Sequence, residues 1–271
     1  MFNLLFFNLA FVLYSISTII YLIFLYAKRE RWSNYGYWLT ILSLTVHSLS
    51  LIVRGFEANH LPMARLFESL SFFGWMVVAI FCFIEYRYKL KILGLFVLPI
   101  VFFILLCGYF FPKEIIPLVP ALQSYWLGIH VGLSLFSYGA FVCGFEFGLM
   151  YLVQDKAIRL KKQMAYLQLP SLEILDNLSY KSVFIGFLFL TLGIITGAIW
   201  ANSAWGSYWS WDPKEIWSLI TWFVYAAYLH ARFLRGWRGR KIAYLTIIGF
   251  GCLLFTFLGV NLLLPGLHTY K

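Results

Sequence analysis

The sequence predicts an all-α, multi-pass membrane protein, and three observations lead to this prediction. Hydrophobic residues fill 62% of the 271 positions and charged residues only 12%, whereas a soluble domain is about one-quarter charged. Long apolar runs recur along the whole chain. Between these runs the basic residues fall in short clusters that alternate in density from one link to the next, which is the charge pattern of membrane topology.

The apolar runs predict about eight transmembrane helices in one membrane domain over residues 1–271, because a helix needs about 20 apolar residues to cross a bilayer. The first run lacks the basic segment of a cleaved signal, so we expect it to be retained as a helix. No run shows the alternation of a β-strand. The predicted spans are 2–26, 36–53, 66–86, 92–111, 125–153, 183–200, 216–231 and 242–264.

The distribution of lysine and arginine predicts the orientation. Links after the first, third, fifth and seventh spans hold 16 of the 21 basic residues. By the positive-inside rule these links face the cytoplasm or stroma, so both termini and the link 201–215 face the opposite side. Because the net charge of +10 is divided among these clusters, it does not indicate a nucleic-acid partner. The basic residues on the outer side are Arg54, Arg65, Lys113, Lys214 and Lys271.

The four cysteines do not indicate a disulfide framework or a zinc site. All lie inside apolar runs and none forms a C-x-x-C pair. Their positions are Cys82, Cys107, Cys143 and Cys252.

The outer link 201–215 concentrates aromatic residues. Six of the eleven tryptophans lie between positions 200 and 222, whereas an aromatic belt would spread over all helix ends. This clustering favours a platform for a large, flat, apolar ligand, formed by Trp205, Tyr208, Trp209 and Trp211. The Asp-Pro pair that follows predicts a helix start, with Asp212 as the N-terminal cap and proline in the first turn. Asp212 can also order the ligand loop.

The five histidines fall at different depths, at about 1.5 Å per helical residue. His130 lies about 7 Å below the outer face and His47 about 9 Å below it, while His230 lies about 21 Å down, near the inner face. His268 follows the last span at or above the outer face, and His60 lies in an outer link. A histidine at a helix end is commonly an interfacial polar residue, and that alternative stays open for His47 and His60.

An iron porphyrin matches this set of residues. Its faces would lie on aromatic rings, its iron would take two imidazoles, and its propionates would need cations at the water edge. Arg54, Arg65 and Lys214 are the candidate cations. His130 and His268 approach the same level and can pair on one haem. His47 and His230 differ by about 12 Å in level, so the partner of His230 is expected from another subunit.

The chain resembles the CcsA/ResC family of cytochrome c biogenesis proteins, within the haem-handling superfamily named for its tryptophan-rich "WWD" loop. The plastid and cyanobacterial branch is the most similar, and one departure is "MAR" at 63–65. The matching segments are "LPMARLFESLSFFGW" (61–75), "PALQSYWLGIHVGLSLFSYGAFVCG" (120–144), "LDNLSY" (175–180), "GAIWANSAWGSYWSWDPKEIWSLITW" (197–222), "YLHAR" (228–232) and "GVNLLLPGLHTY" (259–270).

The resemblance implies a subunit of a System II cytochrome c synthase that works with a CcsB/ResB-like membrane protein. The pair would carry haem b across a bacterial plasma membrane or a thylakoid membrane. It would then present haem on the periplasmic or lumenal side to the C-x-x-C-H motif of apocytochrome c, kept reduced by extracytoplasmic thiol reductants. His130 and His268 would be the outer axial ligands, the 205–212 loop would cradle the ring, and His230 would bind haem within the membrane.

The resemblance leaves some roles open. The second ligand of the intramembrane haem is either His47 or a residue of the partner subunit. We expect no catalytic residue in this chain, because positioning of the bound haem does most of the work. One alternative is a haem exporter that hands haem to a separate chaperone without ligation chemistry. A b-type electron-transfer subunit and a transporter of a lipid-linked substrate are further alternatives.

Overall fold

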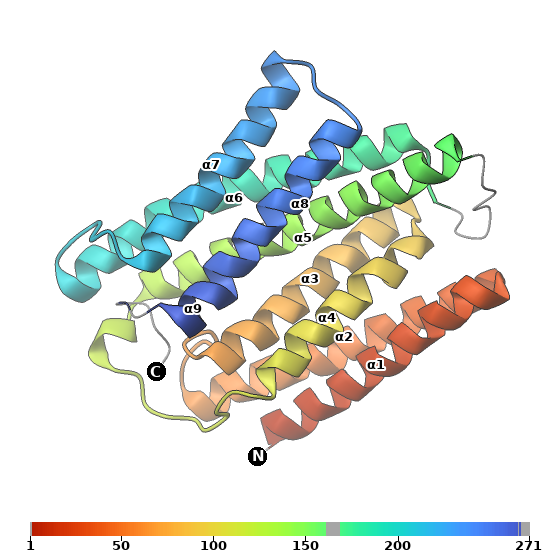
Figure 1. Cartoon of the computed structure of the whole chain (residues 1–271). Helices are drawn as coiled ribbons and strands as arrows, with labels where there is room; N and C mark the ends of the chain where they lie inside the picture. The colour runs from red at the N-terminus through yellow and green to blue at the C-terminus, as the bar shows by residue number, and fades with distance from the viewer. Residues whose placement is uncertain (1, 161–168, 265, 267–271) are drawn as a thin grey trace. The chain divides into compact units, whose positions relative to one another are not determined.

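The structure is a computed structural model that describes residues 2–160, 169–264 and 266. Nearly all of these residues are helical, and none of them lies in a strand. Figure 1 shows the helices in chain order. Their bounds are α1 Phe2–Ala27, α2 Glu30–Ala58, α3 Leu66–Tyr88, η1 Lys91–Leu93, α4 Gly94–Gly108, η2 Pro120–Leu122, α5 Tyr125–Arg159, α6 Leu172–Trp205, α7 Pro213–Leu234, α8 Arg240–Leu254, a π-helical turn Phe255–Gly259, and α9 Val260–Leu263.

The chain folds into two compact units, and each is described by itself. Unit 1 comprises residues 1–117 and 163–170 and contains α1 to α4, and unit 2 comprises residues 118–162 and 171–271 and contains α5 to α9. The sequence led us to expect one domain over 1–271. Hydropathy marks the spans, but it does not say which spans pack together.

Unit 1 is built from two helical hairpins. α1 and α2 are joined by only two residues, and Lys28 makes this turn in the left-handed region with φ 56°. Lys89, with φ 57°, ends α3 in the same way before η1 leads into α4. The inward face of α2 is unusual for a membrane helix, because most of its buried residues are polar.

Unit 2 is organised around the long helices α5 and α6, of 35 and 34 residues. Hydroxyl groups join them: Ser137 Oγ donates to the Gly186 carbonyl at 2.7 Å, and Ser179 Oγ donates to the Gly144 carbonyl at 2.9 Å. α8 packs against α5 and α7. The π-helical turn connects α8 to α9, which brings the chain to the start of α7.

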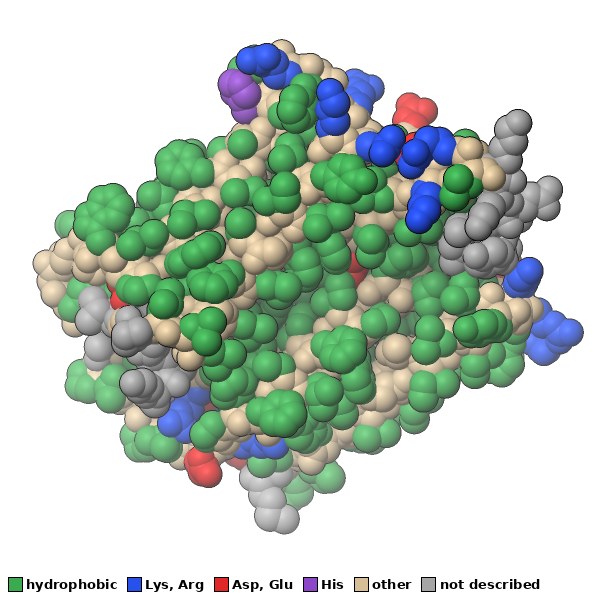
Figure 2. All heavy atoms as spheres, viewed as in Figure 1, with side chains coloured by type: hydrophobic (Ala, Val, Ile, Leu, Met, Phe, Trp, Pro, Cys, Tyr) green, Lys and Arg blue, Asp and Glu red, His purple; other side chains and the backbone are tan. Residues whose placement is uncertain are grey.

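Seven helical segments among the described residues are long and apolar enough to cross a membrane, by length and composition. The eighth predicted span, 216–231, lies within the 22-residue helix α7, which is not among these seven. The prediction of an all-helical multi-pass membrane protein is therefore confirmed, with seven or eight spans. Figure 2 shows hydrophobic side chains over most of the visible face and the basic side chains toward its margins. The seven segments are 2–27, 30–58, 66–88, 91–108, 125–159, 172–205 and 240–263.

Candidate functional site

The tryptophan-rich loop of unit 2 lies between the end of α6 and the start of α7. Gly206 closes α6 in the left-handed region with φ 77°, where a glycine carries no steric penalty. At the other end Asp212 caps α7, its Oδ1 accepting from the Lys214 N–H at 2.9 Å, and Pro213 occupies the first turn. Both predicted roles are confirmed. The loop is therefore held at its two ends by local backbone geometry.

Glu215 organises the middle of this loop, and the sequence analysis did not identify it. Its buried carboxylate accepts from the backbone N–H of Ser210 at 2.8 Å and of Asp212 at 3.2 Å. The second contact completes a capping box with Asp212. The D-P-K-E spacing of the sequence is the signal that predicts such a box.

The aromatic side chains of the loop stay accessible. Trp211 is 67% exposed and Tyr208 is 60% exposed. Trp211 has a φ of 58°, a conformation that residues with a Cβ seldom adopt. Trp209 meets it edge to face, with ring centroids 5.8 Å apart. The Trp209 Nε1 is buried and has no hydrogen-bond partner among the described residues. The loop therefore offers large aromatic surfaces that the unit itself does not cover.

His130 lies near the N-terminal end of α5, against α6. Its Nδ1 donates to the Gly193 carbonyl at 2.7 Å. Because a carbonyl oxygen only accepts, this bond makes Nδ1 the protonated nitrogen and leaves the lone pair on Nε2, the atom that binds a metal. A Cβ added at Gly197 would lie 2.6 Å from the His130 Nδ1, so the absence of a side chain there makes room for the imidazole.

Two tryptophans connect His130 to the loop. The imidazole lies parallel to the Trp200 ring, at 10° and 6.2 Å between centroids. Trp200 in turn meets Trp205 edge to face at 4.9 Å. The predicted neighbourhood of His130 and the tryptophan cluster is therefore present within unit 2.

His268 lies outside the described residues. The described residue closest to it in sequence, Gly266, lies beside the loop: a Cβ added at Gly266 would clash with the Asp212 carboxylate. The chain therefore reaches the base of the tryptophan loop two residues before His268.

The three predicted propionate cations have different surroundings. Lys214 lies at the start of α7, and its Nζ donates to the Asn261 Oδ1 at 3.2 Å. Arg54 is only 3% exposed in unit 1, and its Nε donates to the Glu68 Oε1 at 2.8 Å. This buried ion pair does not fit the prediction that Arg54 meets a propionate at the water edge. Arg65 donates to the Glu114 carbonyl in the same unit.

His47 is fully buried in unit 1, with 0% exposure. Its ring lies edge-on to Phe7 and Tyr14 of α1, and its Nε2 shares a 2.9 Å hydrogen bond with the Ser71 Oγ of α3. For His47 to bind haem iron, these helices would have to separate. His47 is therefore an internal polar residue of unit 1, which differs from the interfacial position of the alternative left open by the sequence.

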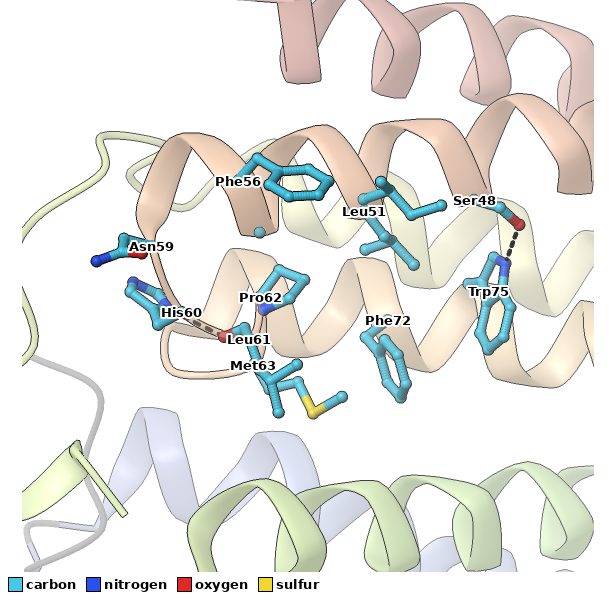
Figure 3. Close-up of a pocket in the computed structure, with 12 residues that line it drawn as sticks. Ser48, Leu51, Phe56, Asn59, His60, Leu61, Pro62, Met63, Phe72 and Trp75 are labelled. Carbon is cyan, nitrogen blue, oxygen red and sulfur yellow. Dashed lines mark hydrogen bonds between the residues drawn. The ribbon is translucent and has the colours of Figure 1, made fainter. Parts of the chain in front are cut away.

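His60 lines an apolar cavity of about 600 Å³ between α2 and α3. Figure 3 shows it near one end of the cavity, where its Nδ1 donates to the Leu61 carbonyl at 2.9 Å. At the other end Trp75 donates to the Ser48 Oγ at 2.8 Å. The cavity walls carry no charged side chain.

His230 lies one turn before the end of α7, and its side chain is exposed. Phe223, Ala227 and Leu234 are exposed at the neighbouring positions of the same helix face. An exposed imidazole on an apolar membrane helix face is unusual. That the partner ligand of His230 comes from another subunit stays a prediction.

Comparisons with known proteins agree with this picture. The family described as "Cytochrome C assembly protein" matches residues 63–268. The cytochrome c biogenesis protein CcsA of Guillardia theta is 41% identical over an alignment of 284 positions, which covers 97% of this chain and 94% of that protein. CcsA of Mesostigma viride is 37% identical over 97% of this chain and 95% of its own length. CcsA of Synechococcus sp. (strain CC9902) is 41% identical over 81% of each chain.

A solved structure titled cytochrome c heme lyase CcmF has the same fold as this chain. The TM-score is 0.69 and the sequence identity 17%, and the match covers 94% of this chain. This chain spans about half of that protein, 46% of its length. At this identity the likeness concerns the fold.

Proposed function

Since the chain belongs to the CcsA family of cytochrome c biogenesis proteins and takes part in cytochrome c maturation, we propose that it is the haem-presenting subunit of a System II synthase. In this proposal it carries haem b across the membrane together with a CcsB/ResB-like subunit. It then holds the haem at the outer face, where the thiols of the apocytochrome C-x-x-C-H motif add to the vinyl groups.

The observation that carries this proposal is the setting of His130. Its Nδ1 bond to the Gly193 carbonyl leaves Nε2 as the ligating atom, and the Trp200–Trp205 pair leads from the imidazole to the exposed aromatic loop. Haem iron takes imidazole ligands, and its macrocycle is large, flat and apolar. The donor set of unit 2 therefore fits haem.

The second outer ligand in this proposal is His268. It is supported by the position of Gly266 beside the Asp212 carboxylate, since two residues then separate the loop from His268. Lys214 is the remaining propionate cation of the loop. The outer side of the membrane follows from the 16 to 5 division of basic residues.

The intramembrane haem of this proposal uses His230. Because the imidazole is exposed on an apolar helix face, a second subunit can bring a ligand to the same iron. A partner residue is therefore preferred to the buried His47.

In this proposal, the chain contributes to the reaction by binding and orienting the haem. The iron and vinyl groups belong to the haem, which supplies the reactivity when bound. Holding two reactants in register contributes about 7–11 kcal/mol to the acceleration of a bimolecular step. Cys82 and Cys143 are buried, so we assign the reduction of the apocytochrome thiols to separate extracytoplasmic reductants.

Co-expression with the partner subunit and a C-x-x-C-H reporter tests synthase against exporter function. We expect haem that stays on the reporter through denaturing electrophoresis. A reporter with alanine in place of both cysteines is the control and should carry none. If haem copurifies with this chain but never becomes covalent on the intact reporter, the exporter alternative is correct.

A further inference from the structure

The buried face of α2 in unit 1 is polar along nearly its whole length. Its buried residues recur every three or four positions, which forms a single stripe. Membrane helices normally turn small residues inward to pack closely, but this stripe also contains a histidine and an arginine. Its members are Ser33, Gly36, Thr40, Ser43, His47, Ser50 and Arg54.

Helix packing accounts for the hydroxyl groups of the stripe, because each has a hydrogen-bond partner within unit 1. Ser17 of α1 and Thr40 share a bond of 2.7 Å between their hydroxyls. Ser50 donates to the Asn3 carbonyl at 2.8 Å. Ser43 donates to the Leu39 carbonyl of its own helix at 2.7 Å.

Packing does not account for five other buried groups of unit 1. Among the described residues, no hydrogen-bond partner is present for the Tyr14 and Tyr21 hydroxyls, the His47 Nδ1, the Arg54 Nη2 and the Glu85 Oε2. Phenylalanine would fill the place of either tyrosine without burying a polar atom. Buried polar groups without partners are rare because their desolvation is costly, and ordered water commonly satisfies them.

These groups lie at successive levels along the helix axes. At about 1.5 Å per residue, Glu85 lies about 5 Å from the inner end of α3, and Tyr21 lies about 9 Å from the inner end of α1. Tyr14 follows at about 20 Å and His47 at about 26 Å from the inner ends of their helices. The Ser17–Thr40 pair, at about 15 Å, lies between the two tyrosines.

The side chains around Tyr21 show that this position is shaped for a tyrosine ring. A Cβ added at Gly36 of α2 or at Gly94 of α4 would clash with the ring. Cys82 and Glu85 of α3 lie within electrostatic reach of the Tyr21 hydroxyl. All four helices of unit 1 therefore contribute to the surroundings of this hydroxyl.

The two ends of the series differ. At the inner end, Glu85 lies near Lys89 and Lys91 of the basic link. At the outer end, the Arg54–Glu68 ion pair closes the stripe, and the Arg54 Nη1 donates to the Lys113 carbonyl at 3.0 Å. This buried, hydrogen-bonded pair fills the outer end of the stripe.

We propose that unit 1 contains a hydrated half-channel that opens at Glu85 and ends at His47, so that protons from the inner aqueous side reach the His47 Nδ1. Water molecules link the Tyr21 and Tyr14 hydroxyls to the imidazole. A proton moves from the inner side to Nδ1 and returns by the same route, with no net transfer across the membrane.

The groups that face His47 allow this exchange. Tyr14 is the titratable group that α1 places against the ring, and Ser71 of α3 bonds to Nε2. The buried residues of α4 include no titratable group. Arg54 lies two turns farther out and is compensated by Glu68. Nδ1 is therefore the ring atom that exchanges with water. The inference goes beyond the proposed function and does not depend on haem.

Water-edited solid-state NMR of the full-length protein in lipid vesicles, labelled with ¹⁵N-histidine, tests the proposal. We expect polarisation transfer from water to the His47 ring, with His47→Asn used to assign the signal. Tyr21→Phe removes a hydroxyl of the proposed route and should abolish the transfer. Ser50→Val lies one turn toward the ion pair and should leave it unchanged.

Three results would overturn the half-channel. If unaltered protein gives no transfer from water to His47, the stripe is a dry packing surface. If Tyr21→Phe retains the transfer, the route does not pass the tyrosine hydroxyls. If Ser50→Val alone abolishes the transfer, water enters from the outer end. The His60 signal of each variant reports whether unit 1 has kept its fold.

Discussion

At the residue scale, the position of the His130 imidazole depends on a neighbouring residue that has no side chain. His130 is seated where Gly197 has no side chain and where the Gly193 carbonyl accepts from Nδ1. The sequence predicted His130 as an outer ligand from its depth and type. It did not predict the two glycines as its supports, because they belong to a helix 60 or more positions away.

Gly197→Ala tests this placement of the His130 imidazole. The added methyl group would lie 2.6 Å from Nδ1 and displace the ring, and a misplacement of about 1 Å can cost about 100-fold in rate. We expect a loss of cytochrome c maturation on that order, measured as covalent haem on a reporter cytochrome. Gly132→Ala is the control on α5, because a Cβ there meets nothing within 4 Å. Equal yields from both variants would contradict the assignment.

The Arg54 prediction shows that the type of a residue does not determine which groups its side chain contacts. Charge and depth placed this side chain among the outer cations, which was reasonable for a helix end. The structure instead turns it inward to Glu68 and Asn3. A single charged residue in a sequence does not reveal whether a carboxylate from the next helix will face it.

At the element scale, local signals predicted helix starts well and helix lengths poorly. The Asp-Pro pair correctly marked the beginning of α7. The span predicted at 183–200 belongs to the longer helix α6, which begins at Leu172. Hydropathy follows the membrane core only, so it misses the polar turns by which a helix extends beyond it.

The Arg54–Glu68 pair predicts how strongly the helices of unit 1 are held together. Arg54→Met leaves a buried carboxylate without its partner, which costs about 3–5 kcal/mol in the free energy of unfolding. The double variant Arg54→Met/Glu68→Gln should recover part of this loss, because no charge remains buried. Denaturant unfolding in detergent micelles measures the free energy of unfolding of both variants.

The pair Arg159–Asp155 of α5, in which the arginine is exposed, is the matched control. Arg159→Met should change the free energy of unfolding by no more than about 1 kcal/mol. If Arg54→Met is equally mild, the buried pair does not hold α2 and α3 together.

At the scale of the whole molecule, composition and charge were sufficient for the class of protein. The motif resemblance to the CcsA/ResC family is confirmed by the family match and by relatives at about 40% identity. The division into two units was not predicted. It depends on which apolar helix faces fit one another, and nearly all faces of this chain are apolar.

The distribution of basic residues predicts the topology. A tag after Lys271 should be accessible to protease added to the outer side of intact cells or organelle-derived vesicles. A tag in the link 235–239 should be cleaved only in inverted vesicles, because this link belongs to the basic side. The opposite pattern would place the tryptophan loop on the cytoplasmic side and remove the basis of the proposed function.

The most direct test of the proposed outer haem site is the absorption spectrum of the complex purified with its partner subunit. We predict a six-coordinate, bis-histidine spectrum at the outer haem. His130→Ala should lose it and added imidazole should restore it, while the control His60→Ala in unit 1 should not change it. If His130→Ala leaves the spectrum unchanged, His130 does not bind the iron, and the central claim is contradicted.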